Sequence, residues 1–350
     1  MSNSNPYASK AMLVLCSFSK WEPRKYDKKV SQEIADKHKT DLKAGRYNKR
    51  LFIETPATLQ AVHSAISAAT DSYYSETLPW SDDGCRLLPS INYLHFCDVM
   101  RAHQARIETA VRAFVADYPS LIDVARTQLN GLFNEEDYPP ASQIADRFGM
   151  VSKFYPVPTG SDFRVDLGKE QVAQLRQQID TDTQGAIDAA MEEVFGQLFD
   201  ATAHMVEMLT AKDPKRSIKD VLVENTRETV ERIKRLNLTG NPKLVEYGNK
   251  IIAKLCASDG QTLRSVETVR ESVAKDAAKL TAELAKEIGI EMPQAESVTA
   301  EKPIKKQAKR KEKPVSKAAK AKAGKPATEP VTAASVDAVV SDLAAMMGMN

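Results

Sequence analysis

Hydrophobic residues recur through most of this chain at the three- and four-residue spacing of an amphipathic helix. The longest run extends from Lys169 to Leu209 and, at about forty residues, corresponds to about 60 Å of helix. Asp213-Pro214 ends this run, and three more helices are predicted over residues 217–236, 243–257 and 263–288. Short breaks between long helices predict antiparallel neighbours, so this half of the chain is expected to form a bundle.

The first 167 residues follow a more mixed pattern. It predicts a strand at 11–18, a helix at 55–76, a long helix at 90–133, a short helix at 141–148, an extended segment at 154–158 and a second strand at 162–167. Tyr118-Pro119 is expected to break the long helix, because proline disfavours a helical conformation in the residue before it. The two strands are expected to pair. A further helix before residue 50 has Asp27 or Ser31 as its expected cap.

These patterns predict a mainly α protein, an elongated helical bundle with long coiled-coil-like helices, a small two-stranded β element and a disordered basic tail. After Pro293 the apolar period is lost, and such a segment cannot bury enough surface to offset the entropy of ordering it. The expected division is an N-terminal α domain with the β element at 1–167, a long-helix bundle at 168–292, a disordered basic linker at 293–332 and a short amphipathic helix at 333–350.

Charge divides the chain into three parts that the net charge of +2 conceals. Residues 1–50 carry 12 basic and 5 acidic side chains, residues 51–301 carry 26 and 38, and residues 302–350 carry 11 and 4. The chain is therefore an acidic body between two basic ends, an architecture that indicates a protein that holds partners.

The two basic ends predict contacts with nucleic acid, because each phosphate that is neutralised releases counterions. The candidate residues are Lys20, Trp21, Arg24, Lys25, Lys28, Lys29, Lys305, Lys306, Lys309, Arg310 and Lys311. Trp21 and Tyr26 lie among the first cluster and are expected to stack on bases, as in single-strand binders. The alternative is that the tail is a solvated linker, and the acidic body argues against a broad DNA-wrapping surface.

A single apolar stripe follows the basic tail. It consists of Val336, Val339, Val340, Leu343, Met346 and Met347. A helix of about fifteen residues is too short to be stable alone, so this one is expected to dock in a groove of a protein partner or neighbouring protomer. The alternative is that it folds back on its own body.

Residues that catalyse reactions or bind metals do not form a recognisable pattern. Cys85, His95, Cys97 and His103 suit zinc by type, but no Cys-x-x-Cys spacing is present and residues two apart do not share a helix face. There is no Gly-rich phosphate loop, Gly-x-Ser-x-Gly or His-Glu-x-x-His motif. We therefore expect a non-enzymatic protein without metal or cofactor.

The loop from Leu78 to Pro89 stays open to two interpretations. In the first, Trp80, Asp82, Asp83, Arg86 and nearby Tyr93 form a recognition surface. In the second, Trp80 fills a gap in the core and Asp82 caps a turn.

The cellular setting follows from composition. Four scattered cysteines predict free thiols in a reducing compartment. No apolar run reaches the roughly 18 residues of a membrane span, and no secretory signal is recognised, so the expected location is the cytoplasm.

A set of short motifs resembles a known family. They are Phe18-Ser-Lys-Trp21, Arg24-Lys25, Asp27-Lys28-Lys29, Ala44-Gly-Arg-Tyr-Asn-Lys49, Leu78-Pro-Trp80, Gly84-Cys-Arg-Leu-Leu-Pro89 and Asp137-Tyr-Pro139. Together they resemble a family of uncharacterised phage, prophage and plasmid proteins, catalogued only as a domain of unknown function, over about residues 10–290. The resemblance implies a bacteriophage or mobile-element origin, hence a bacterial host cytoplasm, and a gene context like that of partners of MoxR-like AAA+ ATPases. It supplies no functional residues.

Two functions are therefore expected. The first is an oligomeric phage or mobile-element scaffold or adaptor that docks partners, such as an AAA+ ATPase, through its terminal helix. The alternative is a nucleic-acid-binding accessory protein that uses both basic ends.

Overall fold

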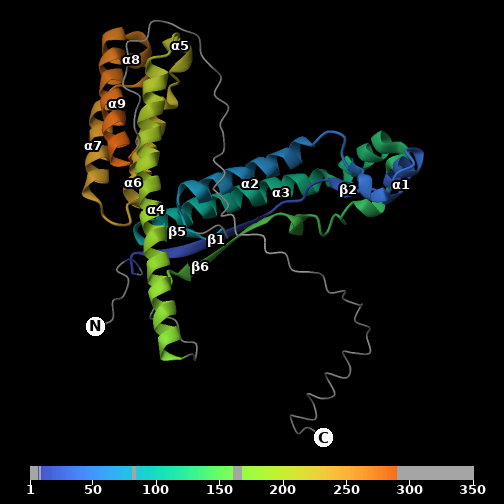
Figure 1. The fold of residues 1–350 in the computed structure, drawn as a ribbon. Coiled ribbons are helices and arrows are strands. Elements are labelled where there is room, and N and C mark those ends of the chain that lie inside the picture. The colour runs from blue at the N-terminus through green and yellow to red at the C-terminus, as the bar shows by residue number, and fades with distance from the viewer. Residues whose placement is uncertain (1–6, 8, 81–83, 161–167, 290–350) are drawn as a thin grey trace. The chain divides into compact units, whose positions relative to one another are not determined.

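The structure is a computed structural model that describes residues 7, 9–80, 84–160 and 168–289 (Figure 1). The strand predicted at 162–167, the basic tail and the terminal apolar stripe lie outside the described residues. Within them, helices predominate and a small antiparallel sheet accompanies them, which confirms a mainly α fold. No helix in this part of the chain combines the length and the apolar character that crossing a membrane requires.

The β structure is larger than the predicted pair of strands. Four strands form an antiparallel sheet in the order β4-β5-β1-β6, and two more form a separate ribbon. Their bounds are β1 Ala11–Ser19, β2 Arg24–Tyr26, β3 Asn48–Arg50, β4 Leu78–Pro79, β5 Arg86–Pro89 and β6 Gly149–Pro156. The prediction of one two-stranded element was therefore wrong. Strands of two to four residues are too short to show a recognisable alternation. The proline at the end of β6 argued against a strand there, although Pro156 is tolerated at the end of an edge strand.

The short helix predicted at 141–148 is also corrected. Only a 3₁₀ turn, Ala145–Arg147, occurs there, and β6 begins two residues later. The prediction failed because a few apolar residues do not specify a helix, and Ile144 and Phe148 are buried in a core without one.

Strand β1 contributes to two apolar cores, because successive side chains point to opposite faces of a sheet. Val14 and Cys16 pack with Tyr73 and Phe96 of the helices α2 and α3. The Tyr73 hydroxyl donates a hydrogen bond to the Val14 carbonyl oxygen at 2.9 Å. Leu13 points the other way and joins the core of the C-terminal helices.

Helices α2 and α3 lie side by side (Figure 1). Their bounds are Ala57–Ser75 and Tyr93–Leu129. The predicted break at Tyr118-Pro119 does not occur, because α3 continues through Pro119. Phe114 and Tyr118 before the proline and Ala125 after it are buried in the same core. Packing on both sides thus offsets the roughly 3 kcal/mol that a proline costs within a helix.

The C-terminal helices follow the predicted apolar period closely. Their bounds are α4 Lys169–Leu209, α5 Pro214–Ser217, α6 Val221–Leu236, α7 Pro242–Leu255, α8 Gly260–Ser265 and α9 Glu267–Glu287. The bounds of α4 are those predicted. The continuous helix predicted over 263–288 is instead divided at Val266, which has an extended backbone. Arg264 donates to the Ile218 carbonyl oxygen at 3.0 Å, and this contact holds α8 against the segment before α6.

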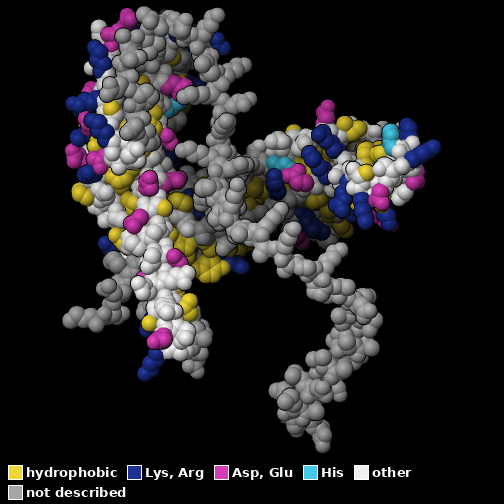
Figure 2. Space-filling model, viewed as in Figure 1, with side chains coloured by type: hydrophobic (Ala, Val, Ile, Leu, Met, Phe, Trp, Pro, Cys, Tyr) yellow, Lys and Arg dark blue, Asp and Glu magenta, His cyan; other side chains and the backbone are white. Residues whose placement is uncertain are grey.

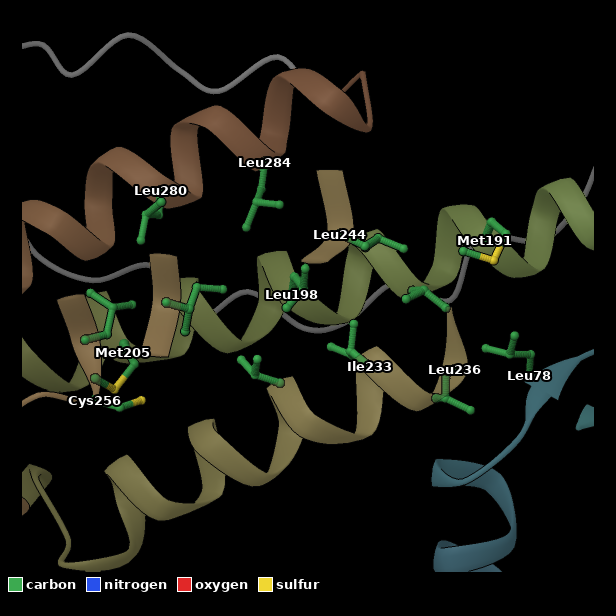
Figure 3. Packing of buried hydrophobic residues seen from close by; sticks show 14 of the residues in the cluster. Leu78, Met191, Leu198, Met205, Ile233, Leu236, Leu244, Cys256, Leu280 and Leu284 are labelled. Atoms are coloured by element: carbon green, nitrogen blue, oxygen red, sulfur yellow. The ribbon is translucent and has the colours of Figure 1, made fainter. Parts of the chain in front are cut away.

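Figure 3 shows the core of these helices. Leu198 of α4, Ile233 of α6 and Leu284 of α9 belong to one buried cluster. Leu244 of α7 completes it, and Leu78 of β4 reaches the same cluster. The sheet and the C-terminal helices therefore share a core. The predicted domain boundary between them stays a prediction.

A polar network also joins the end of α2 to α6. Glu76 is buried, and its carboxylate accepts a hydrogen bond from Asn92 Nδ2 at 3.1 Å. Arg235 Nη2 lies 3.3 Å from the same carboxylate, and Arg235 Nε donates to Asn92 Oδ1 at 2.9 Å. His95 Nε2 lies 3.6 Å from Glu76. The buried carboxylate is thus both paired and hydrogen-bonded, as a buried charge requires.

Candidate nucleic-acid interface

Residues 20–50, which we call the basic lobe, fold into a ribbon, a helix and a 3₁₀ turn. Strands β2 and β3 form the ribbon, and the chain between them forms α1 (Lys28–Lys37) and the turn Leu42–Ala44. Asp27 caps α1, as one of the two predicted caps, because its carboxylate accepts a hydrogen bond from the Val30 amide at 3.1 Å. This hydrogen bond, followed by the nearby Lys49 ammonium, lowers the pKa of Asp27.

Lys49 of β3 fastens the basic lobe to the segment that follows α3. Its ammonium group is buried, 3.3 Å from the Asp27 carboxylate and 2.6 Å from the Asp137 carboxylate. It also donates to the Leu132 carbonyl oxygen at 2.9 Å. Burial alone would lower the pKa of Lys49, but the two carboxylates outweigh burial and raise it. Lys49 is therefore a structural cation and is not free to bind a partner.

The register of the ribbon places four polar side chains on the face opposite Lys49, whereas Lys25, which pairs with Lys49, shares the face of Lys49. Arg24 pairs with Arg50, and Tyr26 pairs with Asn48, so these four side chains share one face. All four are exposed. The Arg46 guanidinium lies over the Tyr26 ring, 5.5 Å from its centroid. We call this surface the outer face of the ribbon.

The basic lobe exposes many more cations than anions. Ten Lys or Arg side chains and four Asp or Glu side chains of this lobe are exposed, while Lys49 and Asp27 neutralise each other inside. Figure 2 shows Lys and Arg side chains gathered where Figure 1 labels α1 and β2. The positive charge that the sequence places in residues 1–50 is therefore displayed on the surface.

Five of the six predicted nucleic-acid residues of the lobe are exposed, and the sixth, Trp21, is half-buried. Arg24 and Lys25 lie exposed on β2, and Lys28 and Lys29 lie exposed in the first turn of α1. Lys20 is also exposed but forms an ion pair with Glu22 at 3.0 Å.

Trp21 lies elsewhere. Its ring is half-buried and packs against Phe52, Phe114 and Tyr118, with centroid distances of 6.1, 6.3 and 6.1 Å. Its carbonyl oxygen lies 3.0 Å from a ring nitrogen of His63. Because this ring packs against an apolar core, it is not available to stack on a base, and Trp21 does not belong to the interface.

Sequence reasoning missed Arg46 and Arg50. Both belong to the basic stretch, but only the pairing of β2 with β3 brings them beside Arg24 and Tyr26. The tail candidates Lys305, Lys306, Lys309, Arg310 and Lys311, and the docking candidates Val336, Val339, Val340, Leu343, Met346 and Met347, lie outside the described residues.

The residues considered for zinc do not come together. Among the residues that the structure describes, no group of three or more His, Cys, Asp or Glu side chains is placed to hold a metal ion. His103 is buried, and its Nε2 lies 2.8 Å from the Ser72 hydroxyl. Burial and the Arg106 charge lower the pKa of His103, so it is neutral near pH 7.

The Trp80 loop has the feature expected if Trp80 fills a gap in the core. Strands β4 and β5 flank it, and Trp80 packs, half-buried, against the core of the C-terminal helices. Asp82 and Asp83 lie outside the described residues.

A second exposed surface is apolar. Ile91 and Leu94, three residues apart where the chain enters α3, are 73% and 74% exposed. Val151, Phe154 and Tyr155 of the edge strand β6 are also exposed, and Figure 2 shows hydrophobic side chains over β6. The Phe154 ring lies 5.6 Å from that of Tyr93 next to Leu94. Phe154 lies on the face of β6 that contacts α3, whereas Val151 and Tyr155 point to the opposite face. We therefore call Ile91, Leu94 and Phe154 the apolar surface.

Comparison of the chain with protein-family models, curated proteins and solved structures finds no significant match. The exposed side chains of this chain therefore provide the basis for its function.

Proposed function

We propose that this protein binds nucleic acid through the outer face of the ribbon and the adjoining first turn of α1. The observation that carries the proposal is the register that sets Arg24 beside Arg50 on an exposed face, with Lys49 turned inward. Guanidinium groups form paired hydrogen bonds with phosphate oxygens, and phosphate contacts supply most of the affinity for nucleic acid. Such contacts carry no sequence information, so binding is expected to be largely independent of sequence.

Fluorescence anisotropy of labelled oligonucleotides with the full-length protein tests the proposal. With about four phosphate contacts, affinity for a duplex should fall about 100-fold between 50 and 200 mM salt. Absence of binding at 50 mM salt contradicts the proposal.

A double substitution tests the location of the interface. Arg24→Gln/Arg50→Gln should remove two phosphate contacts and lower the slope of log affinity against log salt by about 1.8 for duplex DNA. The matched control is Lys275→Gln/Lys279→Gln, which removes two exposed cations from α9. An equal loss in both proteins would show that net charge, and not the ribbon, governs binding.

The basic tail is proposed to add to this affinity through its cations. Neutralising its cations in the full-length chain should weaken binding further and reduce the salt dependence. The substitutions are to Gln at Lys305, Lys306, Lys309, Arg310 and Lys311. Unchanged binding would make the tail a linker.

We propose the adaptor role of a phage or mobile-element protein as a second candidate, supported by the apolar surface. Single exposed apolar side chains are ordinary, whereas a group of them indicates an interaction site. We assign the surface to a neighbouring protomer, and coiled-coil pairing of the long helices belongs to the same proposal. An AAA+ ATPase remains a proposed further partner of the terminal helix.

Sedimentation velocity tests this second candidate. Leu94→Glu/Phe154→Glu should convert an oligomer into monomers, because two carboxylates at an apolar contact cannot be desolvated cheaply. Val245→Glu, at an exposed apolar position of α7, is the control and should change nothing. A monomeric wild-type protein contradicts the assignment. Deleting residues 333–350 separately tests the predicted docking helix, whose loss should reduce partner binding.

A further inference from the structure

The basic lobe contains a cavity beside the outer face of the ribbon. Its volume is about 310 Å³, and it lies between α1 and the segment that leads to β3. Ile34, Ala35, Leu42 and Ala44 give it an apolar wall, and Arg46 also lines it. This volume is at the lower end of the range for ligand pockets, about 300–1,000 Å³, so the cavity suits a small group.

Hydrogen bonds fix the wall of this cavity. The Ser31 hydroxyl donates to the Asp27 carbonyl oxygen at 2.7 Å and accepts from the Tyr47 amide at 2.9 Å, which ties α1 to the segment before β3. The Thr40 amide donates to the Ala35 carbonyl oxygen at 3.0 Å and closes the end of α1. Because the wall is held in place, a ligand that enters does not have to order it, which reduces the entropic cost of binding.

Arg46 connects the cavity to the outer face of the ribbon. The same guanidinium that lies over the Tyr26 ring also lines the cavity. Tyr26 shares its face with Arg24 and Arg50 through the strand register. A polyanion held along the outer face therefore passes the mouth of the cavity. Guanidinium planes and aromatic rings are also the groups on which proteins stack unpaired bases.

We propose that this cavity holds one unpaired base of a single-stranded nucleic acid, whose phosphates lie along the outer face of the ribbon. The inference rests on the proposed function and adds its substrate class. Ile34 is an apolar side chain, 45% exposed, within a lobe that displays mainly cations. A nucleotide combines an apolar base with an adjacent negative charge and so complements both features. The faces of a base are covered in a duplex, so only a single strand can offer one.

Three labelled probes test the inference with full-length protein at 50 and 200 mM salt. They are a thymidine single strand, an abasic single strand of equal length, and the duplex of the thymidine strand. Ile34→Ser removes apolar surface without changing charge. It should weaken binding of the thymidine strand about tenfold and leave the abasic strand and the duplex unchanged, because the apolar contact between Ile34 and the base is lost. Ile53→Ser is the matched control, since Ile53 is 46% exposed and does not line the cavity.

The outcomes separate this inference from the proposed function. If all three probes bind but Ile34→Ser does not weaken the thymidine strand selectively, the cavity holds no base and only this inference fails. An equal loss with Ile53→Ser leads to the same conclusion. If no probe binds at 50 mM salt, the proposed function fails as well. Circular dichroism of both variants checks that α1 is retained.

Discussion

Replacing Lys49 by Met removes the charge that fastens the basic lobe. The Lys49 side chain is 6% exposed, and its two partners, Asp27 and Asp137, are 16% and 11% exposed. Met keeps most of the aliphatic stem, so the change mainly removes the ammonium group. Both carboxylates then lie nearly buried beside each other without a cation, and the Leu132 carbonyl oxygen loses its donor.

The expected cost follows from this burial. Removing one partner of a buried ion pair costs about 3–5 kcal/mol, whereas an exposed pair contributes about 0–1 kcal/mol. Asp27 keeps the hydrogen bond from the Val30 amide, so the lower end applies. We therefore expect Lys49→Met to lower the free energy of unfolding by about 3 kcal/mol. In the unit formed by Met1–Pro293, that loss lowers Tm by about 5 °C.

Tryptophan fluorescence during urea unfolding measures this effect close to the lobe. The chain has two tryptophans, and a Trp80→Phe background leaves Trp21, which lies at the start of the basic lobe and packs against Phe52. Lys25→Met is the matched control, because Lys25 pairs with Lys49 in the register but is exposed. It should change stability by about 0.5 kcal/mol at most.

A second substitution tests the electrostatic cause. Adding Asp137→Asn to Lys49→Met should recover part of the lost stability, because it removes one of the two unpaired charges. Equal unfolding free energies for Lys49→Met and Lys25→Met would refute the reasoning. So would a double variant that is no more stable than Lys49→Met, since the loss would then come from packing.

Three further predictions concern the core and pH. Leu198→Ala should lower the free energy of unfolding by about 2–5 kcal/mol in urea titrations, whereas exposed Val221→Ala should change it by about 0.5 kcal/mol at most. Arg235→Met should cost about 1–3 kcal/mol, because buried Glu76 loses its cation, and Glu76→Gln in the same chain should relieve part of that loss. Burial raises the pKa of Tyr73 to about 12, so the stability that its neutral hydroxyl provides is complete below about pH 10 and disappears as pH rises through 12. The difference in tyrosinate absorbance between the wild-type protein and Tyr73→Phe, followed together with circular dichroism, separates this hydroxyl from those of the other tyrosines. A difference signal that ionises near pH 10 without unfolding contradicts the prediction.

The long helices could be predicted from the sequence because their signals are local. The apolar period of α4 and the Asp213-Pro214 that follows it fix both ends of that helix within neighbouring residues. The strand β1 and the Asp27 cap of α1 are local in the same way. The concentration of positive charge before residue 50 also follows from the sequence, because it depends on residue type alone and not on which residues pack together.

Elements that depend on distant partners could not be predicted. The sheet pairs β1 with β5 and β6, which lie far along the chain, and β4 and β5 are too short to be recognised before they pair. Pro119 remains inside α3 because residues on both sides of it share one core. In each case the free energy of tertiary packing outweighs the local preference.

Lys25 and Lys49 show this division within the candidate interface. By sequence, both are lysines in one basic stretch, and Lys25 was among the candidate nucleic-acid residues whereas Lys49 was not. Residue type determined that each carries a positive charge. The register of the ribbon puts both side chains on one face, and only the approach of Asp27 and of Asp137 from the segment after α3 decided that Lys49 is buried between two carboxylates while Lys25 is exposed. The reason is physical: a local pattern fixes which charges are present, whereas their solvation depends on which distant residues pack against them.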